Sequence, residues 1–331
     1  MRRDTCVVIP VCFPAHIAAD QAAETLRDTV AACCSQVQNP SAICLSVDGR
    51  DLGGALAAQV AGEFGATTVV AEKNRGKLAA AAAGVRHLGD GRAWRYFAVI
   101  DQDGDHFANE LVNFVRVAEH VRDQTAQERV LVLGRRSSRH RPMGLLRGEL
   151  EELADRVLLD ALGYDAVVRQ RPLALEYVFT SDEFPDFHSG YKLFSRVTAQ
   201  DVFMGEPNLC GVSEDCYYRH AVEAVMTVEA LVHGAYLGIV TRSTFNEQPF
   251  STFGVLERCR LVADKMIWPL LRLNVPPAFA RQWLANHIPR LLLSTLAPQG
   301  KEELQRIAAL VLDGCGGKAD DARGFLQPLF V

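Results

Sequence analysis

The stretch Arg95-Tyr-Phe-Ala-Val-Ile-Asp-Gln-Asp-Gly-Asp-His106 decides the fold. Its apolar run, 96–100, is typical of a buried strand, and carboxylates follow at alternate positions, Asp101, Asp103 and Asp105. Carboxylates this close together repel one another and raise one another's pKa, so they stay ionised mainly where a cation joins them. The stretch therefore predicts a strand end at which a divalent metal ion binds.

Two other interpretations of this acidic triplet need to be weighed. A calcium loop of the EF-hand type requires Gly at its sixth position and Glu at its twelfth. The chain has His106 and Val112 there, which excludes that loop. A solvated acidic turn is the commoner origin of an isolated Asp-x-Asp, so the rest of the pattern has to decide between a turn and a metal site.

Strand and helix patterns alternate on both sides of the triplet. Strands are predicted at 5–11, 41–47, 67–70, 130–133 and 174–179, and helices at 17–34, 52–64, 77–88, 107–122, 145–162 and 216–224. This alternation predicts an α/β fold with a parallel sheet, in which ligands bind beyond the carboxyl ends of the strands. Pro10, Asp48 and Asp101 fall at such ends.

Composition narrows the class of protein. The chain has 331 residues, 49% of them hydrophobic, and a net charge of −5, which suits a large folded core and gives no reason to expect nucleic acid as a partner. The N-terminus lacks a secretory signal pattern, and no segment is long and uncharged enough to span a membrane. We therefore expect a cytoplasmic protein.

The order of the motifs resembles the family 2 glycosyltransferases, which have the GT-A fold and transfer a sugar from a nucleotide donor. Matching pieces are Val8-Ile9-Pro10-Val11, the acid of Val47-Asp48-Gly49, and Asn74-Arg-Gly76-Lys77 opening an Ala-rich helix. The Asp-x-Asp follows, and then His188-Ser189-Gly190 and Ser213-Glu214-Asp215. Each piece alone is a weak signal, whereas the full order is strong.

The resemblance implies a Rossmann-like mixed, mostly parallel sheet flanked by helices, and a set of site residues. Asp103 would be the main ligand of Mg²⁺ or Mn²⁺, with Asp101 holding donor hydroxyls or sharing the metal, and His233 as a weaker third ligand. The donor, a UDP- or GDP-sugar, would lie on Pro10, Val11, Asp48, Asn74 and Gly76, and Lys77 would add positive charge at its phosphates.

Catalysis by such an enzyme needs a base against the acceptor hydroxyl. By resemblance this is Asp215, with Glu214 as the fallback, and the products would be inverted in stereochemistry. The alternative is that both acids only complement a helix dipole. His188, Ser189 and Gly190 would face the acceptor, which the sequence leaves open between a glycan, a lipid-linked intermediate and a small metabolite.

Some features depart from the family. Cys12-Phe13-Pro14 and Ala82 stand where the family usually has Tyr-Asn-Glu and Asn, and both changes touch the nucleotide side. The basic run 134–141 is expected to be a solvated loop or a grip on an anionic ligand.

We divide the chain into a glycosyltransferase domain, 1–250, with donor and acceptor halves meeting near 106, and a helical extension, 251–331. The basic residues of that extension are compatible with a homodimer face or a peripheral membrane contact. Two other functions compete with a glycosyltransferase. One is a sugar nucleotidyltransferase, which the absence of a Gly-rich basic loop after the first strand disfavours, and the other is a non-catalytic nucleotide-sugar binding protein.

Overall fold

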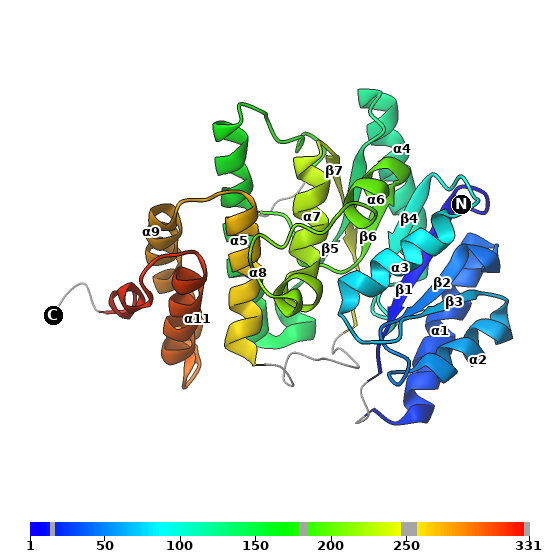
Figure 1. The fold of residues 1–331 in the computed structure, drawn as a ribbon, viewed down its shortest axis with the longest axis horizontal. Coiled ribbons are helices and arrows are strands. Elements are labelled where there is room, and N and C mark those ends of the chain that lie inside the picture. The colour runs from blue at the N-terminus through cyan, green and yellow to red at the C-terminus, as the bar shows by residue number, and fades with distance from the viewer. Residues whose placement is uncertain (14–16, 179–183, 246–256, 328–331) are drawn as a thin grey trace.

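A computed structural model describes residues 1–13, 17–178, 184–245 and 257–327 (Figure 1). Within these residues seven strands form one sheet, in the order β3-β2-β1-β4-β6-β5-β7. β6 is antiparallel to β4 and β5, and the other pairs of described strands are parallel. The predicted mixed, mostly parallel α/β fold is confirmed. The strands are Thr5–Val11 (β1), Ile43–Val47 (β2), Thr67–Val70 (β3), Tyr96–Val99 (β4), Val130–Arg136 (β5), Lys192–Ser195 (β6) and Tyr236–Arg242 (β7).

Helices cover the sheet. α1 packs on β1 and β2, α4 packs on β5 and β7, and α3, α6 and α7 form a connected row (Figure 1). Close packing has a visible cause at Gly84, where a Cβ atom would lie 2.5 Å from a methyl group of Val8. The helices of this part are Ala19–Val37 (α1), Gly54–Phe64 (α2), Lys77–Gly89 (α3), Leu111–Thr125 (α4), His140–Val168 (α5), Arg196–Phe203 (α6) and Val222–Val232 (α7).

Four elements differ from the sequence prediction. The strand expected at 174–179 is absent from its described part, 174–178, and one hydrogen bond from Leu237 N–H to the carbonyl of Ala174 joins that segment to β7. β6 and β7 were not predicted, because their short apolar runs carry little periodicity. The helix expected from Cys216 is a π-helical turn, Cys216–His220, followed by α7.

The C-terminal helices pack against the sheet domain. α8, Arg258–Arg272, contacts α5, α7 and α11 and buries Trp268 completely. The others are Pro277–His287 (α9), Leu293–Leu296 (α10) and Gly300–Gly314 (α11). The domain boundary expected at 250 lies outside the described residues. None of the described helices combines the length and the apolarity needed to cross a membrane.

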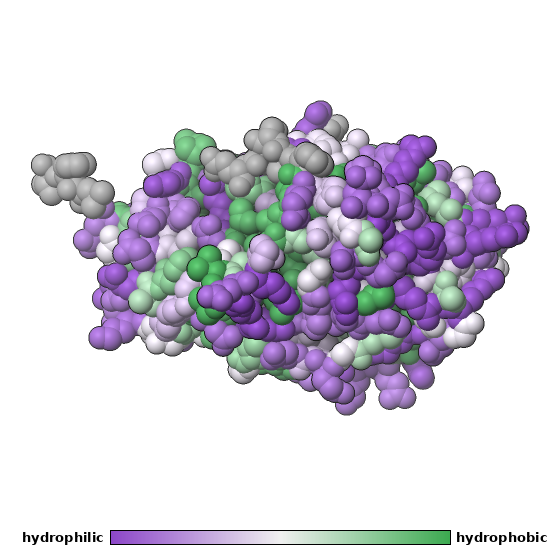
Figure 2. Space-filling view, turned by 90° about the horizontal axis from the view of Figure 1, so that it is seen from above, coloured by the Kyte–Doolittle hydropathy of each residue, from purple (hydrophilic) through white to green (hydrophobic). Residues whose placement is uncertain are grey.

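The described C-terminal helices expose few large apolar side chains. The face seen from above in Figure 2 is mostly hydrophilic, with hydrophobic residues gathered near its middle. On the described C-terminal helices the large exposed apolar side chains are Leu292 and Leu296, which are 53% and 62% exposed. A dimer or membrane contact through this region stays a prediction.

Candidate functional site

The carboxyl ends of several parallel strands lie along one edge of the sheet. β1, β2 and β4 are parallel and in register, with Val11 opposite Val47 and Val8 opposite Val99. Because β6 runs the other way, it begins at this edge, where Lys192 pairs with Val99. The segments that follow β1, β2 and β4 therefore meet the segment that precedes β6, as expected for an open α/β sheet.

Asp48 fixes the start of α3. Its two carboxylate oxygens accept hydrogen bonds from the backbone N–H groups of Arg75 and Gly76, both at 2.8 Å. The first N–H groups of a helix have no partner within the helix, and a carboxylate suits the positive end of its dipole. Asp48 therefore takes the anion position at this helix start. The resemblance had implied that Asp48 would contact the donor and that Lys77 would lie at the donor's phosphates.

Position 76 requires glycine, because both its backbone conformation and its neighbours exclude a side chain. Its φ is +122°, a backbone conformation that favours glycine. A Cβ atom there would lie 2.3 Å from the carbonyl oxygen of Tyr218. The donor-side loop is thus pressed against the π-helical turn of the other half of the chain.

Gln102, the middle residue of Asp-x-Asp, ties two strand ends together. Its Nε2 donates to the carbonyl of Cys12 at 2.7 Å, and its Oε1 accepts from the N–H of Cys12 at 2.8 Å. This pair of bonds joins the segments that follow β1 and β4, beyond the last ladder pair of Val8 and Val99. It holds Cys12, which follows the predicted donor residues Pro10 and Val11 of β1, against the acidic triplet.

The three carboxylates of the triplet have different partners. Asp101 lies 2.7 Å from Nζ of Lys77, and Asp105 accepts from the N–H of Phe245 at 2.6 Å and lies 3.3 Å from Arg242. Asp103 accepts one bond, from the N–H of Asp105, and no described cation pairs with it. The side chains of Lys77 and Arg242 therefore supply part of the positive charge that was predicted beside the triplet.

These partners set the charges of the triplet. Burial alone would raise the pKa of Asp101, but the charge of Lys77 holds it below its ordinary value. At Asp103, burial and then the charge of Asp101 raise the pKa to about 7. Burial also raises the pKa of Asp105, against the opposing effect of Arg242. Asp103 is thus the acid whose charge is least compensated.

Of the predicted metal ligands, Asp103 is the one whose carboxylate has no described cation beside it. The described residues contain no group of three or more His, Cys, Asp or Glu side chains placed to hold a metal ion. Asp101 is engaged by Lys77, whereas the Asp103 carboxylate is available to a cation. Mg²⁺ commonly takes one or two carboxylates and completes its shell with water and substrate phosphate oxygens. Metal binding by Asp103 stays a prediction.

His233 does not reach this edge. It lies just before β7, whose first residue pairs with Val130 at the start of β5. Asp105 contacts Phe245, which follows the other end of β7. The seven residues of β7 separate the two ends by about 20 Å. The last residue of β7, at the end near the triplet, is Arg242, which sequence reasoning missed and which stands there in place of a histidine ligand.

The two acids predicted to supply the catalytic base lie at the rim of the site. The side chains of Glu214 and Asp215 are 63% and 70% exposed, and they pair with Arg75 at 3.1 Å and Arg219 at 2.7 Å. Arg219 also donates to the carbonyl of Asn74 at 2.8 Å. The pair is therefore next to the donor-side loop, and its role as the catalytic base stays a prediction. Neither acid touches the triplet.

Asn74 carries an unused acceptor at the same place. Its Oδ1 is buried without a hydrogen-bond partner, while its Nδ2 lies 3.7 Å from Sγ of Cys12. A buried amide oxygen is normally paired. The predicted donor residue Asn74 therefore has hydrogen-bonding capacity that a ligand could satisfy.

The three predicted acceptor residues have separate environments. The side chain of His188 is fully buried, with Nδ1 2.7 Å from Asp155, so it cannot face an acceptor as predicted. Ser189 Oγ accepts from Arg242 at 3.3 Å. Gly190 reaches the site, since a Cβ atom there would lie 2.7 Å from Oδ2 of Asp101 and 3.0 Å from Nζ of Lys77.

The basic run 134–141 was expected to be a solvated loop or a grip on an anionic ligand, but two of its arginines are buried in ion pairs. Arg136 is buried and bonds Asp186 at 2.5 and 2.8 Å and Glu151 at 2.8 Å. Arg139 is also buried, 3.3 Å from Asp186. The run contributes to a closed cluster of ion pairs beside β5.

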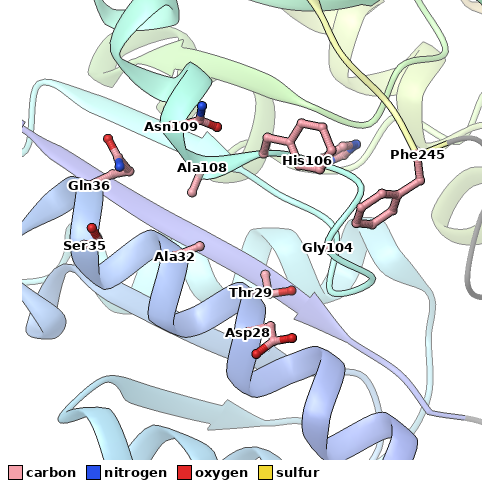
Figure 3. Close-up of a pocket in the computed structure, with 11 residues that line it drawn as sticks. Asp28, Thr29, Ala32, Ser35, Gln36, Gly104, His106, Ala108, Asn109 and Phe245 are labelled. Atoms are coloured by element: carbon pink, nitrogen blue, oxygen red, sulfur yellow. The ribbon is translucent and has the colours of Figure 1, made fainter.

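A groove of about 400 Å³ lies on the α1 side of the triplet (Figure 3). Gly104 and Phe245 form one end, and Gln36 and Asn109 lie toward the other. Phe245 contacts Phe107 edge to face at 5.2 Å. The groove is separate from the loop 74–77, which approaches the triplet through Lys77.

No protein-family profile and no curated protein matches this sequence. Among solved structures, the fold is similar to that of S. aureus TarS 1–349, with a TM-score of 0.46 and 11% identity, over 98% of this chain and 90% of that chain. The structure of TarS 1–349 in complex with UDP gives the same values. A likeness this distant leaves the activity to be inferred from the side chains at the strand edge.

Proposed function

We propose that the protein is an inverting glycosyltransferase of the family 2 type, which moves a sugar from a nucleoside diphosphate donor to an acceptor hydroxyl. One observation carries the proposal: an uncompensated carboxylate, Asp103, and a fixed ammonium group, Lys77, lie at the same carboxyl edge of the sheet. A leaving diphosphate needs positive charge beside it, and an acid with spare oxygens can bring a metal ion there.

The residues would divide the work as follows. Asp103 would hold Mg²⁺ or Mn²⁺, which when bound supplies Lewis-acid stabilisation of the diphosphate. Lys77 would donate an N–H to a phosphate oxygen, and the buried Oδ1 of Asn74 would accept from a UDP- or GDP-sugar. Asp215 would take the proton from the acceptor hydroxyl after release from Arg219, with Glu214 as the fallback.

Calorimetric titration with UDP and GDP, each with and without Mn²⁺, tests the donor half of this proposal. We expect binding that weakens at least tenfold when the metal is removed, because Asp103 and the diphosphate share it. Asp103→Asn should lose the metal-dependent part. The matched control is Asp313→Asn, an exposed acid on α11, which should bind as the wild type does.

Other outcomes would identify the competing functions. Binding of nucleoside triphosphates in preference to diphosphates would favour a sugar nucleotidyltransferase. Diphosphate binding without transfer to any glycan, lipid-linked or small-molecule acceptor would favour a binding protein. Transfer with retained stereochemistry would contradict the single-displacement mechanism.

A further inference from the structure

Lys77 occupies an unusual place for a cation. It is the first residue of α3, where the helix dipole disfavours positive charge. Its Nζ lies 2.7 Å from Oδ1 of Asp101 and 2.9 Å from Oε1 of Glu223. Two acids from different parts of the chain thus hold an ammonium group that its own helix would repel.

Glu223 is well placed to act as the anchor. It lies in the first turn of α7, where the dipole favours an acid, and its side chain is 15% exposed. The other charges that act on it are those of Lys192 and Lys265, both buried. Sequence reasoning missed Glu223, because it belongs to no motif and meets Lys77 across 146 positions.

The contacts leave one donor of Lys77 for a ligand. An ammonium group has three N–H donors, and Asp101 and Glu223 accept two of them. The backbone of Gly190 closes one side, where a Cβ atom would lie 3.0 Å from Nζ. Both described acceptors of Lys77 are thus acids other than Asp103, the acid proposed to hold the metal.

We propose that Glu223 is a positioning residue, which holds the ammonium of Lys77 on Asp101, away from Asp103, with one N–H directed to the diphosphate of the donor. This inference rests on the proposed function and assigns a part of it to a residue of α7. It also joins the two halves of the chain, since Lys77 belongs to the donor half and Glu223 to the acceptor half.

The test compares two glutamates of one helix. Glu229 also lies on α7, and it forms a two-point pair with Arg272 at 2.7 and 2.9 Å, away from Lys77. UDP and GDP are titrated into wild type, Glu223→Gln and Glu229→Gln with Mn²⁺ present. We expect Glu223→Gln to bind at least fivefold more weakly, with partial recovery in Glu223→Asp, while Glu229→Gln binds as wild type does.

Acetylation of Lys77, followed by mass spectrometry, supplies a readout that needs no nucleotide. We expect Lys77 to react at least fivefold faster in Glu223→Gln than in Glu229→Gln, because one of its two acceptors is weakened. Unchanged affinity and unchanged labelling in Glu223→Gln, or equal changes in both variants, would overturn the role of Glu223. A wild type that binds neither nucleotide would instead overturn the proposed function, while the labelling would still report whether Glu223 anchors Lys77. If Glu223→Gln does not fold, Glu223→Asp carries both measurements.

Discussion

The edge of the sheet with Asp48, Asn74 and the acidic triplet, called here the donor edge, and the ion-pair cluster beside β5 differ in how completely their charges are paired. At the donor edge, Asp48 and Asp105 bind backbone N–H groups, and one acid, Asp103, lacks a described cation. In the cluster, charges pair with charges, as Arg136 does with Asp186 and Glu151. Both regions lie at the same edge of one sheet, since β4 and β5 each pair antiparallel with β6.

The difference separates scaffold from site. A buried pair with its hydrogen bonds satisfied has nothing left for a ligand, and breaking it leaves an uncompensated buried charge. A buried carboxylate or amide whose oxygen lacks a partner lowers the stability of the fold unless a ligand supplies that partner. By this criterion Asp103 and Asn74 belong to the site, and Arg136 belongs to the scaffold, although the sequence made the basic run look like a possible ligand grip.

The largest effect is expected at Arg136. Arg136→Met should lower the free energy of unfolding by about 3–5 kcal/mol, because Asp186 and Glu151 would stay buried without their partner. Urea denaturation measures the loss. Arg129→Met removes an ion pair with Asp201 in which Arg129 is 44% exposed, and should cost less than about 1 kcal/mol. Equal losses would abolish the distinction between buried and exposed pairs.

Gly76→Ala comes next. It forces a side chain into positive φ and against the carbonyl of Tyr218, and we expect a loss of about 3 kcal/mol. The control is Gly62→Ala, in α2 with nothing within 4 Å of the added Cβ, which should gain about 0.5–1 kcal/mol from higher helix propensity. Thermal unfolding of the two variants should shift in opposite directions, and a stable Gly76→Ala would refute the tight contact.

Asp48→Asn should have a smaller effect. An amide has one acceptor oxygen, so one of the N–H groups of Arg75 and Gly76 loses its partner, at a cost of about 2 kcal/mol. Hydrogen exchange at those two amides should accelerate, while exchange at the β2 amides of Cys44 and Leu45 serves as the internal control. Unaltered exchange at 75 and 76 would show that Asp48 does not hold the loop.

The effect that is smallest per step of the experiment is a pH dependence at Lys192, which accumulates with each pH unit. Its Nζ donates to the carbonyls of Phe187 and Ser189, and burial lowers its pKa to about 8. Since the pKa of an unfolded lysine is near 10.4, the unfolded state binds more protons between pH 8 and 10. The stability of wild type relative to Lys192→Met should therefore rise across this window, by at most about 1.4 kcal/mol per pH unit. A constant or falling difference would contradict the lowered pKa.

Much of the donor half was predictable because its signals are local. The strands at 5–11 and 67–70 were predicted to the residue, since both are runs rich in β-branched residues. The edge at Asp48 and Asp101 followed from the rule that ligands bind beyond parallel strands, and the family resemblance added Asn74 and Gly76. The acceptor half was harder, because β6 has only four residues and runs antiparallel to its neighbours, and β7 has glycine and polar residues within it.

The sequence by itself determined the α/β class, the strand that ends in the acidic triplet and the residue types available there, because periodicity and motif order are written along the chain. Only the tertiary structure decided the partners. Lys77 meets Glu223, Asp105 meets Arg242, and His188 is buried on Asp155. These contacts join residues 33 to 146 positions apart, and charge compensation depends on distance in space, which no local pattern encodes.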